Sequence, residues 1–319
     1  MAAGVVKRVL LASPRGYCAG VERAVETVER ALRLYGPPVY VRRQIVHNAH
    51  VVRDLEGRGA VFVADERDVP EGATLVLSAH GVAPAVHRRA DERRLNTIDA
   101  TCPLVTKVHV QARRYAADGC AVVLIGHAGH EEVEGTMGEA PQAITLVQSV
   151  EDAEALDLPA GQDVAYVTQT TLSVDETAEI VSTLRRRFPH MRAPLREDIC
   201  YATSNRQWAV KQMLDEIDLL LVIGSANSSN SNRLVEVARA VGVEAYLIED
   251  ESEIDAAWLD GAETVGVTSG ASAPESLVAR VCDWFRRRGV GEIGDFASVY
   301  EDVVFKLPVE LRRAETSAA

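Results

Sequence analysis

The sequence predicts an α/β protein built from three similar modules with parallel sheets. Short apolar runs alternate with amphipathic helical segments, and this alternation is typical of parallel sheets. A cysteine that opens a helical segment recurs at Cys18, Cys102 and Cys200, at spacings of 84 and 98 residues. Polar loops follow the strands, and in such folds ligands bind at the carboxyl ends of the strands. The modules are predicted to span residues 1–98, 99–195 and 196–289.

The first module is expected to open with a buried strand at residues 5–13, ahead of Cys18. An amphipathic helix follows at 21–35, where apolar residues recur at helical spacing until Gly36-Pro37-Pro38 ends it. The remaining elements are predicted as strands at 39–42, 61–63, 74–77 and 96–99 and helices from Ala49 and up to about Arg94.

The second module is expected to open at Cys102, where the strand 96–99 gives way to a helix at 105–117. Pro103 suits the first turn of a helix, so Cys102 is predicted at the N-cap, where the helix dipole favours a thiolate. The elements that follow are a strand at 120–125, a polar loop at 126–136, strands at 143–147 and 164–168, and helices at 150–156 and 173–188. The last helix begins with a capping box, Ser173 to Glu176.

The third module repeats this order after Cys200. Its elements are predicted as helices at 205–217, up to Val241 and at 276–288, strands at 219–223, 245–248 and 265–268, and a polar loop at 224–232. Ser272 and Glu275 have the spacing of a second capping box.

Composition restricts the function. The net charge of −13 argues against nucleic acid or an anionic membrane as the main partner. No targeting segment and no run of about 18 apolar residues is visible, so the protein is expected to be cytoplasmic, with reduced cysteines.

Three equivalent cysteines suggest a metal site. Cys120 begins a strand and Cys282 lies on the apolar stripe of a helix, so both are expected in the core. Zinc with three cysteines and a histidine is the alternative to an iron–sulfur cluster, although structural zinc is usually held by closely spaced pairs. A cluster held by three thiolates leaves one iron open, which favours catalysis.

Polar loops after the strands predict an anion site. Ser228, Ser229, Asn230 and Ser272 open helices, where backbone amides and hydroxyls bind anions. His47, His80 and His130 lie in comparable loops, and together these residues favour a phosphate-type ligand. Because these loops contain no lysine, a Walker-type nucleotide loop is not indicated.

The acidic run His130-Glu-Glu-Val-Glu134 has two interpretations. It can be a solvated helix start, because carboxylates favour that position. Alternatively, a carboxylate that faces a metal and an anion can transfer protons, with Thr170 as a relay.

Distinctive motifs lie along nearly the whole chain. They are Gly-Tyr-Cys18-Ala-Gly-Val, Gln-Ile-Val-His47-Asn, Ser-Ala-His80-Gly-Val, Asp-Ala-Thr-Cys102-Pro-Leu-Val, Gly-His130-Glu-Glu132-Val-Glu-Gly-Thr, Thr-Gln-Thr170-Thr-Leu-Ser, Asp-Ile-Cys200-Tyr-Ala-Thr-x-Asn-Arg, Gly-Ser-x-Asn-Ser228-Ser-Asn-Ser-Asn-Arg and Gly-Ala-Ser272-Ala-Pro. Together they resemble the 4-hydroxy-3-methylbut-2-enyl diphosphate reductase family, the last enzyme of the non-mevalonate isoprenoid pathway.

The resemblance implies a pseudo-threefold cloverleaf of α/β modules around a [4Fe–4S] cluster held by Cys18, Cys102 and Cys200. It implies that the diphosphate binds to seven residues: His47, His80, His130, Ser228, Ser229, Asn230 and Ser272. Glu132 would supply protons with Thr170 near it, and two external electrons from a ferredoxin- or flavodoxin-type donor would remove the hydroxyl as water. The products would be isopentenyl and dimethylallyl diphosphate.

Two details extend the resemblance. Glu131 stands where the family commonly has proline. Within the C-terminal tail, 290–319, residues 303–312 resemble the family's tail, which packs on the first module. Two other functions remain open. One is another three-cysteine cluster enzyme, such as a quinolinate synthase-like enzyme or a hydro-lyase, and the other is a non-catalytic iron–sulfur sensor.

Overall fold

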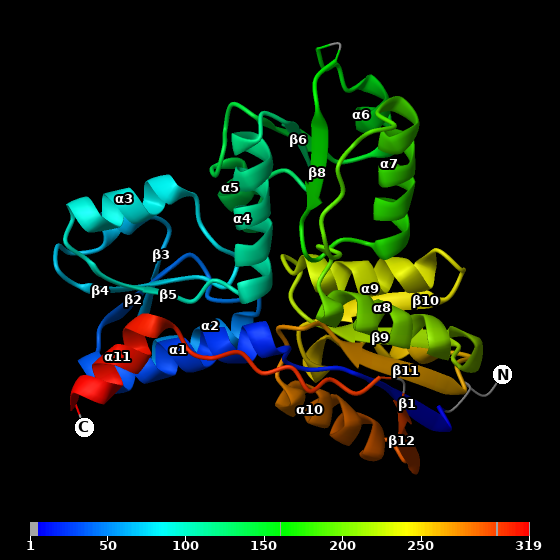
Figure 1. The fold of residues 1–319 in the computed structure, drawn as a ribbon. Helices are drawn as coiled ribbons and strands as arrows, with labels where there is room; N and C mark the ends of the chain where they lie inside the picture. The colour runs from blue at the N-terminus through cyan, green and yellow to red at the C-terminus, as the bar shows by residue number, and fades with distance from the viewer. Residues whose placement is uncertain (1–5, 160, 298, 319) are drawn as a thin grey trace. The chain divides into compact units, whose positions relative to one another are not determined.

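The computed structural model describes residues 6–159, 161–297 and 299–318. Its strands form three sheets in the orders β10-β9-β11-β1-β12, β3-β2-β4-β5 and β7-β6-β8. Every pairing between these strands is parallel. The predicted α/β class with parallel sheets is therefore confirmed (Figure 1).

The elements have the following bounds. The strands are β1 (Arg8–Ser13), β2 (Val39–Arg42), β3 (Ala60–Val63), β4 (Thr74–Leu77), β5 (Asn96–Asp99), β6 (Ala121–Ile125), β7 (Ile144–Val147), β8 (Val164–Thr168), β9 (Leu219–Ile223), β10 (Glu244–Ile248), β11 (Thr264–Ser269) and β12 (Glu292–Ala297). The α-helices are α1 (Ala19–Tyr35), α2 (Ala49–Gly57), α3 (Pro84–Glu92), α4 (Pro103–Ala117), α5 (Glu131–Met137), α6 (Val150–Ala155), α7 (Val174–Arg187), α8 (Tyr201–Met213), α9 (Ser229–Arg239), α10 (Glu275–Arg286) and α11 (Val309–Ala318). The 3₁₀ helices are η1 (Glu66–Asp68), η2 (Leu214–Glu216), η3 (Glu251–Glu253) and η4 (Ala256–Leu259).

The chain forms two compact units. The first comprises the described residues of Met1–Ala19, His47–Val51 and Tyr201–Val304. The second comprises those of Gly20–Val46, Val52–Cys200 and Phe305–Ala319.

The first unit is built around the sheet that contains β9, a strand whose residues are all buried. Helices α8 and α9 cover one face with side chains such as Met213 and Leu234. Helix α10 covers the other face with Leu277 and Phe285 (Figure 1). The ring of Trp258 stacks on Tyr246 at a centroid distance of 4.0 Å beside this core.

The second unit contains the other two sheets. Helix α3 packs Val86 and Ala90 on the sheet of β2 to β5, and α11 contacts β5. On the sheet of β6 to β8, α4 and α5 cover one face, and α6 and α7 cover the other. Each sheet is thus covered by helices, as parallel sheets require.

Most predicted elements are present. The strands predicted at 39–42, 74–77, 96–99, 164–168 and 219–223 have these bounds. The strand predicted at 5–13 begins at Arg8, and its residue Val5 lies outside the described residues. Cys102 is the N-cap of α4 with Pro103 at the first helical position, as predicted. Ser173 accepts a hydrogen bond from the Glu176 amide, which confirms Ser173 as the N-cap of α7.

Four expectations are corrected. The predicted loop at 126–136 contains the start of α5, and Ser229–Asn232 of the other predicted polar loop form the first turn of α9. Polar residues are common in first helical turns, so polarity alone did not distinguish loop from helix. Helix α8 begins at Tyr201 rather than at 205 and ends at Met213. The second capping box is absent, because Pro274 precedes α10 without a side-chain cap and the Ser272 hydroxyl bonds elsewhere.

Strand pairing distributes the predicted first module over two sheets. Strand β1 lies between β11 and β12, whereas β2 to β5 form a sheet of their own. The boundaries at 98/99 and 195/196 stay a prediction.

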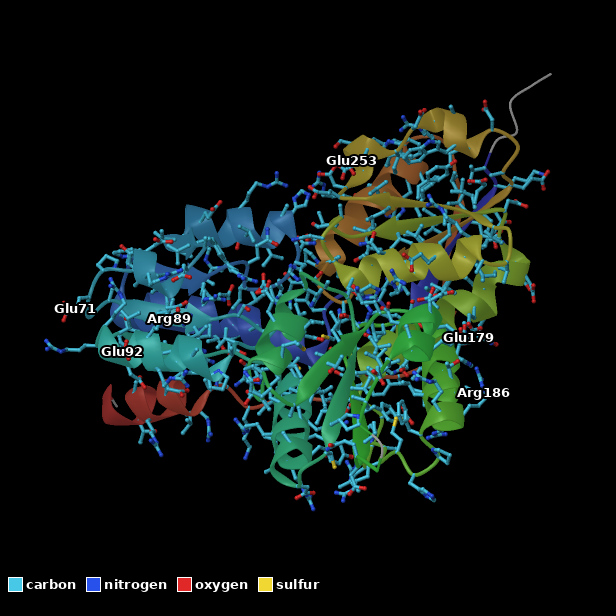
Figure 2. The ribbon with its side chains drawn as sticks, turned by 90° about the horizontal axis from the view of Figure 1, so that it is seen from above. Glu71, Arg89, Glu92, Glu179, Arg186 and Glu253 are labelled. Atoms are coloured by element: carbon cyan, nitrogen blue, oxygen red, sulfur yellow. The ribbon has the colours of Figure 1, made fainter. Side chains whose placement is uncertain are left out.

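Acidic side chains lie on the surface. Glu71, Glu92, Glu179 and Glu253 are exposed (Figure 2). Among the described helices, none combines the length and the apolar character that crossing a membrane requires.

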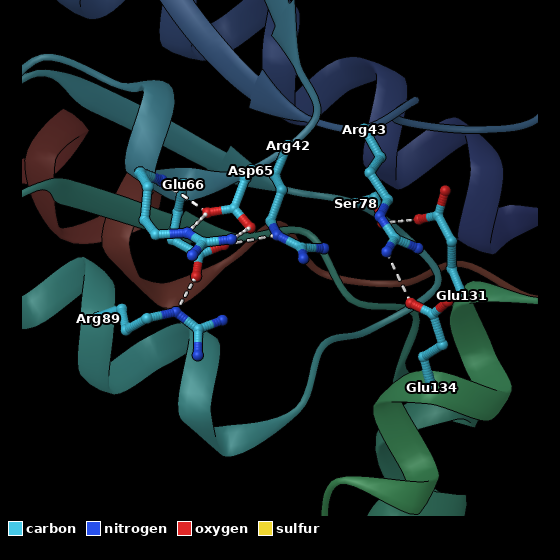
Figure 3. Close-up of polar contacts among 9 residues, drawn as sticks. Arg42, Arg43, Asp65, Glu66, Ser78, Arg89, Glu131 and Glu134 are labelled. Carbon is cyan, nitrogen blue, oxygen red and sulfur yellow. Dashed lines mark hydrogen bonds and ion pairs between the residues drawn. The ribbon is translucent and has the colours of Figure 1, made fainter. Parts of the chain in front are cut away.

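One acid is buried instead. Glu66 on η1 has no exposed surface, and its carboxylate contacts Arg42 of β2 at 2.8 Å and Arg89 of α3 (Figure 3). Burial tends to raise the pKa of Glu66, but hydrogen bonds from its own backbone and from the two arginines lower it overall. This carboxylate therefore ties η1 to a strand and a helix of the second unit.

We expect the substitution Glu66→Gln to lower the free energy of unfolding by roughly 2–4 kcal/mol, because it leaves the guanidinium of Arg42 without a counter-charge. Urea denaturation followed by far-UV circular dichroism measures this. Glu71→Gln is the control, since Glu71 is exposed and pairs with exposed Arg94; its effect should stay within about 0.5 kcal/mol. Equal effects of the two substitutions would contradict the role of Glu66.

Candidate active site

Three thiols occupy equivalent positions at helix starts. Cys18 directly precedes α1, Cys102 is the N-cap of α4, and Cys200 directly precedes α8. All three are thiols outside any disulfide, and all are partly exposed. Partly exposed thiols at helix starts are accessible to a metal, which binds a cysteine as its thiolate.

The other two cysteines differ in their surroundings. Cys120 and Cys282 are buried, and burial raises the pKa of each thiol. Neutral thiols in apolar cores are poor metal ligands. The donor chemistry of Cys18, Cys102 and Cys200 therefore fits an iron–sulfur cluster, whereas that of Cys120 and Cys282 does not.

In the first unit, the loop that carries Cys18 is fixed through its backbone. The Cys18 amide donates to the carbonyl of Ala271 at 3.1 Å, and the Gly16 amide donates to the Ser269 hydroxyl at 2.8 Å. Arg206, which has no exposed surface, donates to the Gly16 carbonyl at 2.8 Å. Sequence analysis gave Arg206 no role, because a buried arginine has no signature in hydrophobic periodicity.

The serine- and asparagine-rich segment lies against the same loop. The Ser228 hydroxyl caps α9 by accepting hydrogen bonds from the amide and the hydroxyl of Ser231, at 3.3 and 2.9 Å. The Asn230 carboxamide accepts from the Ala271 amide at 3.0 Å and donates to the Thr203 hydroxyl at 3.2 Å. Ala271 thus links Asn230 to Cys18.

His47 is held by two strand-end loops of the first unit. The Ser272 hydroxyl donates to the His47 carbonyl at 2.8 Å, and the Asn227 amide nitrogen lies 3.2 Å from Nδ1 of His47. Ser272 therefore positions His47 in this structure, and its hydrogen must turn away from that carbonyl before it can reach a phosphate. Cys18, His47, Ser228, Asn230 and Ser272 are all connected within this unit, and Ser229 is the first residue of α9.

In the second unit, both remaining thiols are fixed at strand-end loops. The Cys102 amide donates to the Ala79 carbonyl at 2.9 Å, one residue before His80. The Cys200 amide donates to the Thr170 carbonyl at 3.0 Å. The structure thus places each thiol beside a residue that the sequence assigned to the site.

Glu132 and Thr170 form a buried pair. The Thr170 hydroxyl donates to Oε1 of Glu132 at 2.7 Å, and the Thr170 amide donates to Oε2 at 2.8 Å. Each residue is 5% exposed. A carboxyl group that is hydrogen-bonded to a hydroxyl and shielded from bulk water is suited to proton transfer.

His130 has a defined tautomer. Its Nδ1 accepts a hydrogen bond from the Glu132 amide at 3.1 Å, so the neutral ring carries its hydrogen on Nε2. Burial lowers the pKa of His130, and the charge of Glu132 only partly opposes this. The ring of His80 meets it edge-on at 5.9 Å.

Glu131 and Glu134 have different environments. Oε2 of Glu131 accepts from the Ser78 hydroxyl at 3.3 Å (Figure 3). The same oxygen lies 3.4 Å from Nδ1 of His80. Burial tends to raise the pKa of Glu131, but the hydrogen bond and charge of His80 and the charge of Arg43 lower it overall. Glu134 is half exposed and pairs with Arg43 at 2.7 Å. The acidic run is therefore not a uniformly solvated helix start.

His109 also went unassigned by sequence analysis. Its side chain is 7% exposed and its Nδ1 lies 2.8 Å from Glu139. The ring passes so close to Gly81 and Gly135 that a Cβ at either glycine would lie within 3.2 Å of it. His109 thereby spaces the His80 loop from α5, which carries Glu132.

The fold and these side chains together define a class of protein. The thiols of Cys18 and Cys102, the imidazoles and hydroxyls suited to an anion, and the buried acid–hydroxyl pair follow strands of parallel sheets. The backbone of Cys200 bonds to the loop after β8. The class is an α/β enzyme with the donor groups of a metal-dependent catalyst.

Comparison with known proteins identifies the family. Residues 9–286 match the LytB protein family. The 4-hydroxy-3-methylbut-2-enyl diphosphate reductase of Acidothermus cellulolyticus is 62% identical over 308 residues, which is 96% of this chain and 91% of that protein. A reductase of the same name, numbered 1, from Mycobacterium bovis is 59% identical over 307 residues, covering 96% and 92%.

A solved structure of a diphosphate reductase has a similar fold. The structure of the E-1-hydroxy-2-methyl-but-2-enyl-4-diphosphate reductase from Plasmodium falciparum is 39% identical, with a TM-score of 0.94 over 98% of this chain and 99% of that chain. The chain belongs to the LytB family of 4-hydroxy-3-methylbut-2-enyl diphosphate reductases.

The hydrogen bond to Nδ1 and the lowered pKa give a prediction for His130. We expect its ring at pH 7 to be neutral with the hydrogen on Nε2, and to titrate below the histidines of the same protein unfolded in urea. Nitrogen-15 NMR of histidine-labelled protein measures both properties, with His130→Gln to assign the signal. A ring that is charged at pH 7, or that carries its hydrogen on Nδ1, would contradict this assignment.

Proposed function

We propose that this chain catalyses the reductive dehydroxylation of 4-hydroxy-3-methylbut-2-enyl diphosphate. The products are isopentenyl and dimethylallyl diphosphate, in the last step of the non-mevalonate isoprenoid pathway. The family and the 62% identity over 96% of the chain support this reaction. The structural observation that carries it is the placement of three thiols at equivalent helix starts. We also propose a cytoplasmic location.

Cys18, Cys102 and Cys200 hold a [4Fe–4S] cluster in this proposal. Three thiolates leave one of the four irons without a protein ligand. The bound cluster supplies electrons, which an external ferredoxin- or flavodoxin-type donor replaces. The cloverleaf arrangement of three modules, 1–98 with the tail 290–319, 99–195 and 196–289, belongs to the same proposal.

The diphosphate is assigned to hydroxyls, amides and imidazoles from both units. The first unit contributes His47, Ser228, Ser229, Asn230 and Ser272, and the second contributes His80 and His130. The Ser228 hydroxyl uses its oxygen to cap α9, which leaves its hydrogen as a donor for a phosphate oxygen. His130 can donate from Nε2 in its neutral form.

Glu132 and Thr170 are assigned to proton delivery. The reaction takes two electrons and two protons: the C–O bond breaks, a C–H bond forms, and the hydroxyl leaves as water. Loss of water is much easier than loss of hydroxide, so an acid must protonate the leaving oxygen. Glu132 is suited to this role because it is buried and its Oε1 shares a hydrogen with the Thr170 hydroxyl at 2.7 Å.

The cluster assignment predicts which cysteines matter. We expect Cys18→Ser, Cys102→Ser and Cys200→Ser each to lose the cluster or the activity, because each removes a thiolate ligand. Cys120→Ser and Cys282→Ser should retain both. Anaerobic visible and electron paramagnetic resonance spectra, with iron and sulfide analysis, measure this. A cluster that survives Cys18→Ser in active form but is lost in Cys120→Ser would refute the ligand set.

The anion site predicts an effect on affinity. Ser228→Ala removes one hydrogen bond to a charged group, worth roughly 1.5–3 kcal/mol, so substrate affinity should fall about ten- to a hundredfold. Ser149→Ala is the matched control, because Ser149 caps α6 in the same way; it should lose comparable stability but no affinity. Titration calorimetry with the diphosphate and with the alcohol that lacks it tests the site, and equal affinity for both ligands would exclude it.

Proton delivery predicts different effects for the three acids. Glu132→Gln should lower turnover by about 10²–10⁴-fold while the cluster and the affinity survive. Glu134→Gln is the control, because Glu134 is half exposed and should turn over normally. Glu131→Gln should weaken binding rather than turnover, since Glu131 contacts His80. Normal turnover by Glu132→Gln, or an equal loss in Glu134→Gln, would show that Glu132 has another role.

A further inference from the structure

The ammonium group of Lys107 contacts three oxygen atoms of one segment. Lys107 lies on α4, five residues after Cys102. Its Nζ donates to the carbonyls of Arg196 and Glu197, at 2.9 and 2.6 Å. It also lies 2.9 Å from Oδ1 of Asp198. The ammonium group therefore makes two hydrogen bonds and one ion pair with three successive residues.

The segment that Lys107 contacts leads directly to Cys200. The Asp198 side chain has no exposed surface, and its Oδ2 accepts from the Thr168 amide at the end of β8, at 3.1 Å. Two residues later, the Cys200 amide donates to the Thr170 carbonyl. The segment is therefore fixed on one side by α4 and on the other by the end of β8.

The contacts at position 107 suit a lysine better than an arginine. Only four of the 34 basic residues of the chain are lysines. A compact ammonium can bring one atom within reach of three converging oxygens, whereas the planar fork of arginine spreads its donors. The three contacts of Lys107 therefore require lysine, which is the rarer of the two basic residues in this chain.

Cys200 also needs such a support more than the other two thiols. Cys18 and Cys102 follow β1 and β5 after a few residues, so strand pairing sets their position. Cys200 instead follows a segment of irregular structure after α7, which pairs with β8 through a single bridge between Ala165 and Arg192.

We infer that Lys107 is a positioning residue that fixes the separation of Cys102 and Cys200, so that both thiols meet the same cluster. Lys107 acts through backbone carbonyls and Asp198, without touching either sulfur. The inference rests on the proposed function, in which both cysteines are ligands. Loss of an outer partner of a metal site typically lowers metal affinity by about 10- to 100-fold.

Iron release from the assembled protein tests the inference. Lys107→Met keeps the length of the side chain and removes its donors. We expect anaerobically purified Lys107→Met to release iron to bathophenanthroline disulfonate about 10- to 100-fold faster than the unsubstituted protein. Its electron paramagnetic resonance spectrum after reduction should differ as well, because the geometry of the ligands changes.

Two controls separate positioning from general loss of stability. Glu66→Gln destabilises the same unit through Arg42 and Arg89, which lie on β2 and α3. Lys7→Met removes an exposed pair with Glu263. Iron release from Lys107→Met that is no faster than from Glu66→Gln would overturn the inference while leaving the proposed function intact. An unsubstituted protein that binds no cluster would overturn the proposed function and the inference with it.

A second variant covers the case in which Lys107→Met does not fold. Lys107→Arg keeps the charge opposite Asp198 but cannot place one atom near all three oxygens. We expect it to release iron at least about threefold faster than the unsubstituted protein. Release at the unsubstituted rate would overturn the requirement for an ammonium group at this position.

Discussion

Parallel pairing of the described strands is the constraint on which the candidate site depends. Parallel strands place their carboxyl ends at one edge of each sheet. Strand direction alone therefore brings together the residues that follow different strands of that sheet. The site residues assigned after strands follow the carboxyl end of one by two to seven positions, from Thr170 after β8 to Glu132 after β6. Cys200 is the exception, and its support comes from side chains instead of strand pairing.

Hydrogen bonds to the backbone do most of the positioning around the site. Arg206 holds the loop of Cys18 through the Gly16 carbonyl, Ser272 holds His47 through its carbonyl, and Lys107 holds the segment before Cys200. A side chain that binds a carbonyl fixes the chain without constraining the neighbouring functional side chain.

Hydrophobic pattern and motif spacing predicted the strands, the parallel sheets and the equivalence of three cysteines, because these depend on local periodicity and chain order. The motifs that resemble the family also supplied the residues that we assign to the site. The pattern could not show that Glu131, Glu132 and Glu134 have different environments. Those environments are set by tertiary contacts with His80, Thr170 and Arg43. Likewise, the burial of Glu66 and Arg206 could not be predicted, because charged residues are expected on the surface. The start of α5 was missed because its first turn is polar.

The distribution of tryptophan has a practical meaning for spectroscopy. Trp208, Trp258 and Trp284 all belong to the first unit. Indole emission therefore reports on that unit, including the stacked pair of Tyr246 and Trp258, while the second unit contributes no indole signal among its described residues. Far-ultraviolet ellipticity, by contrast, sums the helices of both units. Two melting curves recorded in the same cell, one at each wavelength, would thus resolve whether the two halves of the molecule lose their structure as one cooperative body or in sequence.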